Sequence, residues 1–123
     1  MKSILLVDDD EQFRTMLTEV LERAGYQVFA VADGNEAVLQ YQRHQTDLVI
    51  TDIIMPEKEG LEMITELRHL HPDAKIVAIS GGGRGNAQDY LKMAAAFGAD
   101  RVLAKPFSNR EVLEAVNTIL EAN

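Results

Sequence analysis

Three features of the sequence predict an α/β protein with a doubly wound parallel sheet. Short apolar runs alternate with amphipathic stretches along the whole chain of 123 residues. The apolar runs are nearly continuous, which is typical of parallel strands covered by helices on both faces. Capping residues stand at the starts, and glycines at the ends, of several amphipathic stretches. We therefore expect a strand and a helix repeated five times, written (βα)5, with right-handed crossovers.

Five segments are expected to form the strands. Four are apolar runs, which lie at residues 4–7, 48–50, 76–79 and 102–104. The remaining strand covers residues 26–31 and includes Gln27, a polar residue that favours a less buried position at an edge of the sheet.

Helices fit between these strands. The first helix has Asp10 as its N-cap and Gly25 at its end. Capping-box spacing marks the starts of the second and fifth helices, in the pairs Asp33 with Glu36 and Ser108 with Glu111. The third helix is expected at about residues 58–70, and the fourth at about residues 86–97, with Gly98 after it.

Composition limits the chain to one domain and restricts its partners. We expect residues 1–123 to form a single domain, because a hydrophobic content of 46% is enough for one core. The net charge of −8 argues against binding to nucleic acid or to an anionic membrane, since both surfaces would repel the chain. A protein partner or a cation fits this charge better.

Two further features favour a cytoplasmic protein. The chain has no cysteine, which suits a reducing compartment. The apolar stretch at residues 4–7 is too short for a signal peptide or a membrane span.

Polar side chains follow four of the expected strands. They are Asp8 with Asp9, then Asp52, Ser80 and Lys105. Because a parallel sheet gathers the carboxyl ends of its strands at one edge, these groups should lie together where open α/β sheets bind ligands. Converging carboxylates need a cation among them, and an all-oxygen site favours Mg²⁺ or Mn²⁺ over zinc. A lysine and a hydroxyl beside that metal would complete a site for a phosphoryl group.

These residues lie in four short motifs that resemble the receiver domains of two-component response regulators, including the stand-alone CheY-like ones. The motifs are LLVDDD at 5–10, VITDIIMP at 49–56 with Gly60, IS at 79–80 and LAKPF at 103–107. Each motif alone is common, but the four in this order at strand ends are specific. The resemblance covers the whole chain and implies a flavodoxin-like, CheY-like sandwich with strand order 2-1-3-4-5. It also implies a single receiver domain over 1–123 with no output domain.

The resemblance assigns the metal site. Asp9 and Asp52 would bind Mg²⁺ directly, and the backbone carbonyl of Ile54 would be a third protein ligand. Asp8 would act through a metal-bound water.

It also assigns the groups that handle the phosphoryl group. Asp52 would be the nucleophile that accepts it from a phosphohistidine. Lys105 would pair with the phosphoryl oxygens, and Ser80 would move to donate a hydrogen bond to another of them. The bond between Lys105 and Pro106 is expected to be cis, which only proline makes inexpensive.

Two departures from the family pattern concern switching. Many receivers carry Tyr or Phe three residues before the lysine, where this chain has Val102. The segment after Ser80 is also a few residues longer than usual, and it begins with the glycine-rich stretch 81–85, which includes Gly81 and Gly82. Glycine lowers the energetic barrier to rearrangement, so we expect this loop to reshape when Asp52 is modified.

The implied partners are a histidine kinase or a histidine phosphotransfer protein, and a downstream protein target. The target would bind a surface that we call the partner face, formed by the fourth helix, fifth strand and fifth helix and including Tyr90, Lys92, Arg101, Leu103 and Arg110. The chain is expected to be a monomer or a weak dimer. As an adaptor, a phosphorelay intermediate or a phosphate sink, it would turn over no external product.

Two other functions remain as alternatives. One is a small phosphatase of the haloacid dehalogenase type, in which Asp8 is the nucleophile and Asp10 the acid and base. That alternative leaves Asp52 without a role, and no cap domain fits in 123 residues. The other is a degenerate receiver that binds partners without phosphate, against which the intact Asp52, Ser80 and Lys105 argue.

Overall fold

The computed structural model describes residues 1–53, 60–81, 92, 95–96 and 98–121. Its sheet consists of parallel strands in the order β2-β1-β3-β4-β5, which confirms the expected fold class. The strands are β1 (Ser3–Val7), β2 (Gln27–Val31), β3 (Leu48–Asp52), β4 (Ile76–Gly81) and β5 (Arg101–Lys105). The helices are α1 (Glu11–Arg23), α2 (Gly34–Arg43), α3 (Gly60–Leu70) and α5 (Asn109–Glu121).

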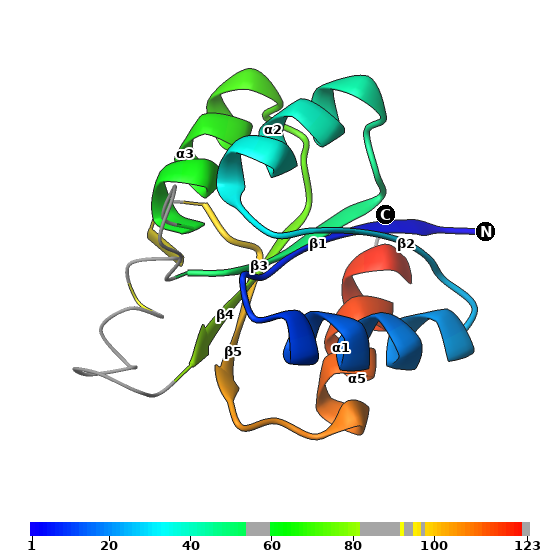
Figure 1. Ribbon diagram of the computed structural model, residues 1–123. Helices are drawn as coiled ribbons and strands as arrows, with labels where there is room; N and C mark the ends of the chain where they lie inside the picture. Colours follow the sequence, from blue (N-terminus) through cyan, green and yellow to red (C-terminus); the bar gives the residue numbers. More distant parts are fainter. Residues whose placement is uncertain (54–59, 82–91, 93–94, 97, 122–123) are drawn as a thin grey trace.

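Helices cover both faces of the sheet, so successive residues of a central strand enter different cores. Figure 1 shows α2 and α3 on one face and α1 with α5 on the other. In β1, Leu5 and Val7 belong to the core under α2 and α3, whereas Ile4 and Leu6 belong to the core under α1 and α5. Both sets are fully buried. This two-sided burial is the reason that β1 reads as a continuous apolar run.

The two edge strands are less buried than the central ones. Gln27 begins β2 and is exposed, and β2 is an edge strand as predicted. The other edge strand is β5, where Ala104 is exposed and Val102 is only half-buried. Val102 still packs against the core under α2 and α3, and Leu103 packs against the core under α1 and α5, so both faces of β5 contact a core. A three-residue apolar run does not distinguish a central strand from an edge strand.

The predicted helix caps are present where the structure describes them. The side chain of Asp10 accepts hydrogen bonds from the backbone N–H groups of Gln12 and Phe13 at the start of α1. Gly25 has a φ of 100° just beyond the end of α1, a left-handed conformation that glycine adopts without strain.

The capping pairs of α2 and α5 differ in completeness. At α5 the backbone of Ser108 donates to Glu111, and the backbone of Glu111 donates to the Ser108 hydroxyl, which forms a complete capping box. At α2 the Asp33 carboxylate accepts from the backbone of Glu36 at 2.9 Å.

Two expected helices lie partly outside the described residues. The predicted start of the third helix at residue 58 is one such position, and α3 is described from Gly60. Most of the expected fourth helix is likewise outside, although Lys92 and residues 95–96 are helical. No helix among the described ranges is long and apolar enough to cross a membrane.

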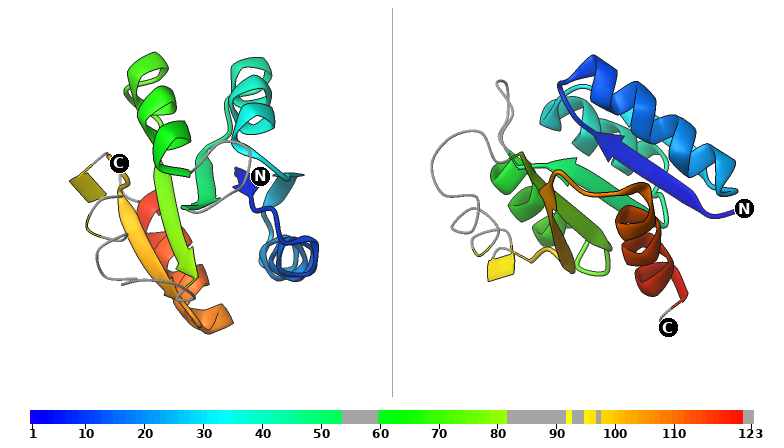
Figure 2. Two further views of the ribbon diagram at one scale, coloured as in Figure 1. Left: turned by 60° about the vertical axis from the view of Figure 1, so that its left-hand side comes forward. Right: turned by 90° about the horizontal axis from the view of Figure 1, so that it is seen from below.

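The strand register brings the polar strand ends to one level of the sheet. Val7 pairs with Thr51, so Asp8, which follows β1, and Asp52, the last residue of β3, lie at the same level of the sheet. Asp52 pairs with Ile79, the residue before Ser80. Lys105 pairs with Gly81, the residue after Ser80. Figure 2 shows the strands side by side from two further directions, with their carboxyl ends at one edge.

Candidate functional site

Three carboxylates meet at the carboxyl ends of β1 and β3. One carboxylate oxygen from each of Asp8, Asp9 and Asp52 lies within 4.8 Å of the others. Asp8 and Asp52 are buried, with 1% and 8% exposure, whereas Asp9 is exposed. The cluster is therefore open to solvent on one side and enclosed by the sheet on the other.

Asp8 is the most enclosed member of the cluster. Burial raises the pKa of Asp8 above its ordinary value of 3.8, while a hydrogen bond from the backbone of Asp10 and the charge of Lys105 oppose that rise. The Asp10 N–H donates to Asp8 Oδ1 at 2.9 Å. The backbone carbonyl of Asp8 accepts from the Arg14 guanidinium at 2.7 Å. Asp8 is thus held at both its side chain and its main chain.

Lys105 supplies a positive charge to this cluster. Its Nζ lies 3.4 Å from Asp8 Oδ2 and 3.9 Å from Asp52 Oδ2. The peptide bond between Lys105 and Pro106 is cis, as expected. A single ammonium beside three carboxylates leaves a net negative site, which attracts a cation.

Ser80 and Val102 lie on the two strands that complete this side of the sheet. Ser80 is fully buried, and among the residues that the structure describes its Oγ has no hydrogen-bond partner. A buried hydroxyl without a partner is unusual in a native structure and carries a free-energy cost. Val102 packs against the core under α2 and α3.

Gly60 allows the first turn of α3 to approach the end of β3. Its N–H donates to the carbonyl of Ile53 at 2.6 Å. A Cβ at position 60 would overlap the carbonyl oxygen of Asp52 and lie 2.6 Å from Ile53 Cα. Only glycine fits this approach, so Gly60 has a steric role beside Asp52.

Two residues of α1 contact the site although the sequence pattern did not single them out for this. The ring of Phe13 lies under the Lys105 ammonium, with 3.8 Å between Nζ and the ring centroid. Arg14 donates to Asp8 as described above. Both residues lie in the first turn of the helix that follows the acidic pair. This proximity in sequence is the feature that could have identified them as neighbours of the site.

The carboxylate cluster fits a hard divalent cation. Its ligand atoms are all oxygens, they converge within 4.8 Å, and Asp8 and Asp52 are buried carboxylates. The described residues contain no cysteine or histidine in this cluster, so a zinc-type ligand set is absent from it. Asp8, Asp9 and Asp52 are therefore suitable ligands for Mg²⁺.

Two predicted site residues, Ile54 and Gly82, lie outside the described residues. Gly81 is the last residue of β4.

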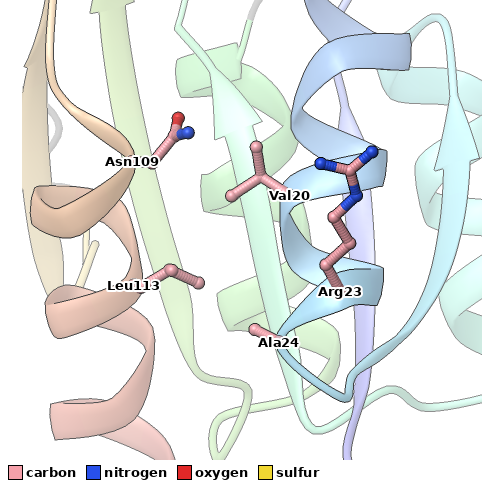
Figure 3. Close-up of a pocket in the computed structure, with 5 residues that line it drawn as sticks. All are labelled: Val20, Arg23, Ala24, Asn109 and Leu113. Atoms are coloured by element: carbon pink, nitrogen blue, oxygen red, sulfur yellow. The ribbon is translucent and has the colours of Figure 1, made fainter.

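A separate cavity of about 270 Å³ lies between α1 and α5 and contains no carboxylate. Figure 3 shows Val20 of α1 opposite Asn109 and Leu113 of α5, and Arg23 and Ala24 complete the lining. The acidic cluster is therefore not part of this cavity.

Comparison with known proteins agrees with this architecture. The family model of the response regulator receiver domain matches residues 4–117. The chain is 38% identical to the chemotaxis protein CheY of Thermotoga maritima, over 96% of this chain and 97% of that protein. It is 36% identical to CheY of Halobacterium salinarum, over 98% of both chains. The high-resolution structure of the chemotaxis response regulator CheY4 of Vibrio cholerae is similar to this one, with a TM-score of 0.86 at 30% identity over 98% of this chain and 99% of that one. The chain belongs to the response regulator receiver family, and within it to the CheY-like receiver domains.

Proposed function

We propose that this protein is a single-domain response regulator that accepts a phosphoryl group on Asp52 in a Mg²⁺-dependent reaction. The observation that carries the proposal is the convergence of Asp8, Asp9 and Asp52 within 4.8 Å, with the Lys105 ammonium 3.9 Å from Asp52. Nothing in packing or capping requires these groups to share one edge of the sheet.

In the proposed reaction a phosphoryl group passes from a histidine of the donor protein to Asp52. A carboxylate oxygen of Asp52 attacks the phosphorus of a phosphohistidine, the P–N bond breaks, and the donor imidazole leaves with the electron pair and takes up a proton. Asp52 is suited to this attack because its carboxylate keeps some exposure, whereas that of Asp8 is almost fully enclosed. The product is an aspartyl phosphate.

Charge neutralisation is the main task of the surrounding residues. Asp9 and Asp52 would hold Mg²⁺ or Mn²⁺ directly, Asp8 would act through a water, and the bound ion would offset the charge of the phosphoryl oxygens. The backbone carbonyl of Ile54 is proposed as a further ligand. The ammonium of Lys105 supplies a second positive charge close to Asp52.

Ser80 is proposed as the group that senses the modification. Its buried hydroxyl lacks a partner among the described residues. A phosphoryl oxygen on Asp52 would give that hydroxyl an acceptor, which favours a conformation in which Ser80 has moved toward it. Val102 offers no aromatic ring to follow this movement, so the switch would depend on Ser80, on Lys105 and on the loop that begins with Gly81 and Gly82.

The proposed partners are a histidine kinase or a histidine phosphotransfer protein as donor, and a protein target on the partner face. Among the described residues of that face, Lys92, Arg101 and Arg110 are exposed. Exposed cations on an acidic chain suit a target with acidic side chains, and one of them, Arg110, also pairs with Glu114 at 3.1 Å. We further propose that the protein acts in the cytoplasm as a monomer or weak dimer, with one domain over residues 1–123.

The two alternative functions receive less support. In a phosphatase of the haloacid dehalogenase type, Asp10 would be the acid and base, but its carboxylate accepts the backbone hydrogen bonds that cap α1. A degenerate receiver, which binds partners without phosphate, does not require a half-buried lysine beside buried carboxylates. That arrangement fits a phosphoryl group.

Intact-mass measurement after incubation with Mg²⁺ and acetyl phosphate tests the proposal. We expect wild type and the control Asp73→Ala, an exposed site at the α3–β4 turn, to gain one phosphoryl group. Asp52→Ala, or wild type with EDTA, should gain none. A gain retained in Asp52→Ala but lost in Asp8→Ala would support the phosphatase chemistry instead. Absence of any gain in wild type would support a degenerate receiver.

A further inference from the structure

The ring of Phe13 lies directly under the ammonium of Lys105. The distance from Nζ to the ring centroid is 3.8 Å, which is well inside the range of a cation–π interaction. The same Nζ lies 3.4 Å from Asp8 Oδ2 and 3.9 Å from Asp52 Oδ2. The ammonium is thus held by a ring and two carboxylates together.

Phe13 is itself held in place from two directions. Its backbone N–H donates to Asp10 Oδ1 at 3.2 Å, which fixes it in the capped first turn of α1. Its ring meets the ring of Phe107 edge to face, with 6.0 Å between centroids and 85° between planes. Phe107 follows Lys105 by two residues, so the same chain segment supplies both the cation and the ring that supports Phe13.

An apolar core position does not require these contacts. Any large aliphatic side chain at position 13 could cover the core between α1 and α5, to which Phe13 belongs as a partly buried member. Only an aromatic ring offers a negative face to the ammonium. The location of Nζ over the ring, 3.8 Å from its centroid, therefore indicates an electrostatic contact in addition to packing.

We propose that Phe13 is a positioning residue for phosphotransfer, which keeps the Lys105 ammonium beside Asp52 before a phosphoryl group arrives. This inference rests on the proposed function of Asp52. Lysine has a flexible four-carbon stem, and a free lysine would lose that freedom when it engaged the phosphoryl oxygens. The ring and the carboxylates restrict the stem in advance, so less ordering remains when the reaction occurs. Because Nζ is already 3.9 Å from Asp52 Oδ2, it can meet a phosphoryl group on Asp52 without leaving the ring.

A series of substitutions at position 13 separates the electrostatic contact from packing. Phe13→Leu removes the ring and keeps most of the apolar volume, and Phe13→Tyr restores a ring. Incorporation of phenylalanine with one, two or three fluorine atoms weakens the negative face of the ring stepwise at nearly constant shape. Phe29→Leu is a matched control, because Phe29 is a half-buried phenylalanine on the edge strand β2 whose ring contacts that of His44, with 5.1 Å between centroids and 51° between planes.

The first measurement is independent of phosphorylation. A ring under Nζ should shift the NMR signals of the Lys105 ε protons upfield in wild type, in Phe13→Tyr and in Phe29→Leu. That shift should disappear in Phe13→Leu. An unshifted Lys105 signal in wild type would overturn the proposal at its structural basis.

The second measurement is the rate constant of phosphorylation at saturating acetyl phosphate and Mg²⁺. Phe13→Leu should lower it about threefold to tenfold, between the values of exposed and desolvated cation–π contacts. Phe13→Tyr should restore it, and the fluorinated series should lower it stepwise while the urea midpoint stays constant. Phe29→Leu should leave the rate unchanged.

Two results at this stage would overturn the positioning role. One is a rate in Phe13→Leu that equals or exceeds that of wild type. The other is a loss of rate that does not follow the fluorine number, which would indicate a packing effect. If the wild-type protein is not phosphorylated at all, the proposed function is overturned, and the positioning role with it. In that case the upfield shift of the Lys105 ε protons would still show whether the ring contact exists.

Discussion

Replacement of Gly60 by alanine is expected to destabilise the protein through a clash with main-chain atoms. The new Cβ would overlap the carbonyl oxygen of Asp52, and it would lie 2.6 Å from Ile53 Cα and 2.9 Å from the carbonyl carbon of Asp52. Gly60 does not have a positive φ, so alanine can adopt its backbone conformation. The loss of stability therefore comes from the steric clash alone.

The size of the effect follows from what the Cβ meets. Overpacking in a protein core costs typically 1–3 kcal/mol, and we expect about 3 kcal/mol here because the end of a central strand cannot rotate away. Alanine is a better helix former than glycine by about 1 kcal/mol, which offsets part of that loss. The net loss is about 2 kcal/mol. With a urea m-value of about 2 kcal/mol/M for a domain of this size, the unfolding midpoint should fall by about 1 M.

Urea unfolding followed by circular dichroism measures this shift, and Gly25→Ala is the matched control. Gly25 has a φ of 100°, and a Cβ added there would have no atom within 4 Å, so its substitution should cost only the left-handed penalty of about 1 kcal/mol. The clash at position 60 also displaces Asp52, so phosphorylation should slow in Gly60→Ala and not in Gly25→Ala. A urea midpoint for Gly60→Ala equal to or above that of Gly25→Ala would refute the reasoning, because it would show that the end of β3 can shift to accommodate the added Cβ at little cost in free energy.

Two further predictions concern buried polar groups at the site. Ser80→Ala should stabilise the unphosphorylated protein by about 1 kcal/mol in urea unfolding, because it removes a buried hydroxyl that has no partner among the described residues. Thr51→Val, which removes a hydroxyl that donates to the Asp52 carbonyl at 2.9 Å, should instead destabilise it, and equal losses in both variants would contradict this account. In EDTA, wild-type stability should fall as pH rises above 3.8 through the raised pKa of Asp8, because the folded state then holds a proton that the unfolded state has released. Asp8→Asn should lack this fall and gain less thermal stability from Mg²⁺ than wild type does, and identical pH profiles for the two proteins would argue against it.

The fold could be predicted largely from local patterns. Continuous apolar runs identified the central strands because helices cover both faces of each strand, as Leu5 and Leu6 show by entering different cores. Capping residues such as Asp10 and Ser108 identified helix starts because a cap acts on backbone groups within its own turn. The same reasoning did not show that residues 102–104 form an edge strand. Whether a strand is central or at an edge depends on its neighbours, which a short apolar run does not reveal.

The sequence predicted which residues belong to the candidate site better than it predicted the contacts that they make. Asp8, Asp52, Ser80 and Lys105 each lie at the end of a strand, and parallel strands end at one edge, so their proximity was implied by the topology. The roles of Phe13 and Gly60 beside that edge depend on distances between side chain and main chain across layers. Sequence spacing places Phe13 in the helical turn that follows the acidic pair, but it does not give these distances.

Local patterns of residue types are enough to predict the alternation of strands and helices, the helix caps and the set of polar groups at the strand ends. These features arise from interactions within a few residues along the chain, so a pattern of residue types is enough to recognise them. Three features could be established from the packed structure alone: the Lys105 ammonium lies on the Phe13 ring, the Ser80 hydroxyl is buried without a described partner, and Gly60 lies against the backbone of Asp52. These features depend on atomic distances that are set when the helices pack on the sheet, and a pattern of residue types does not give such distances.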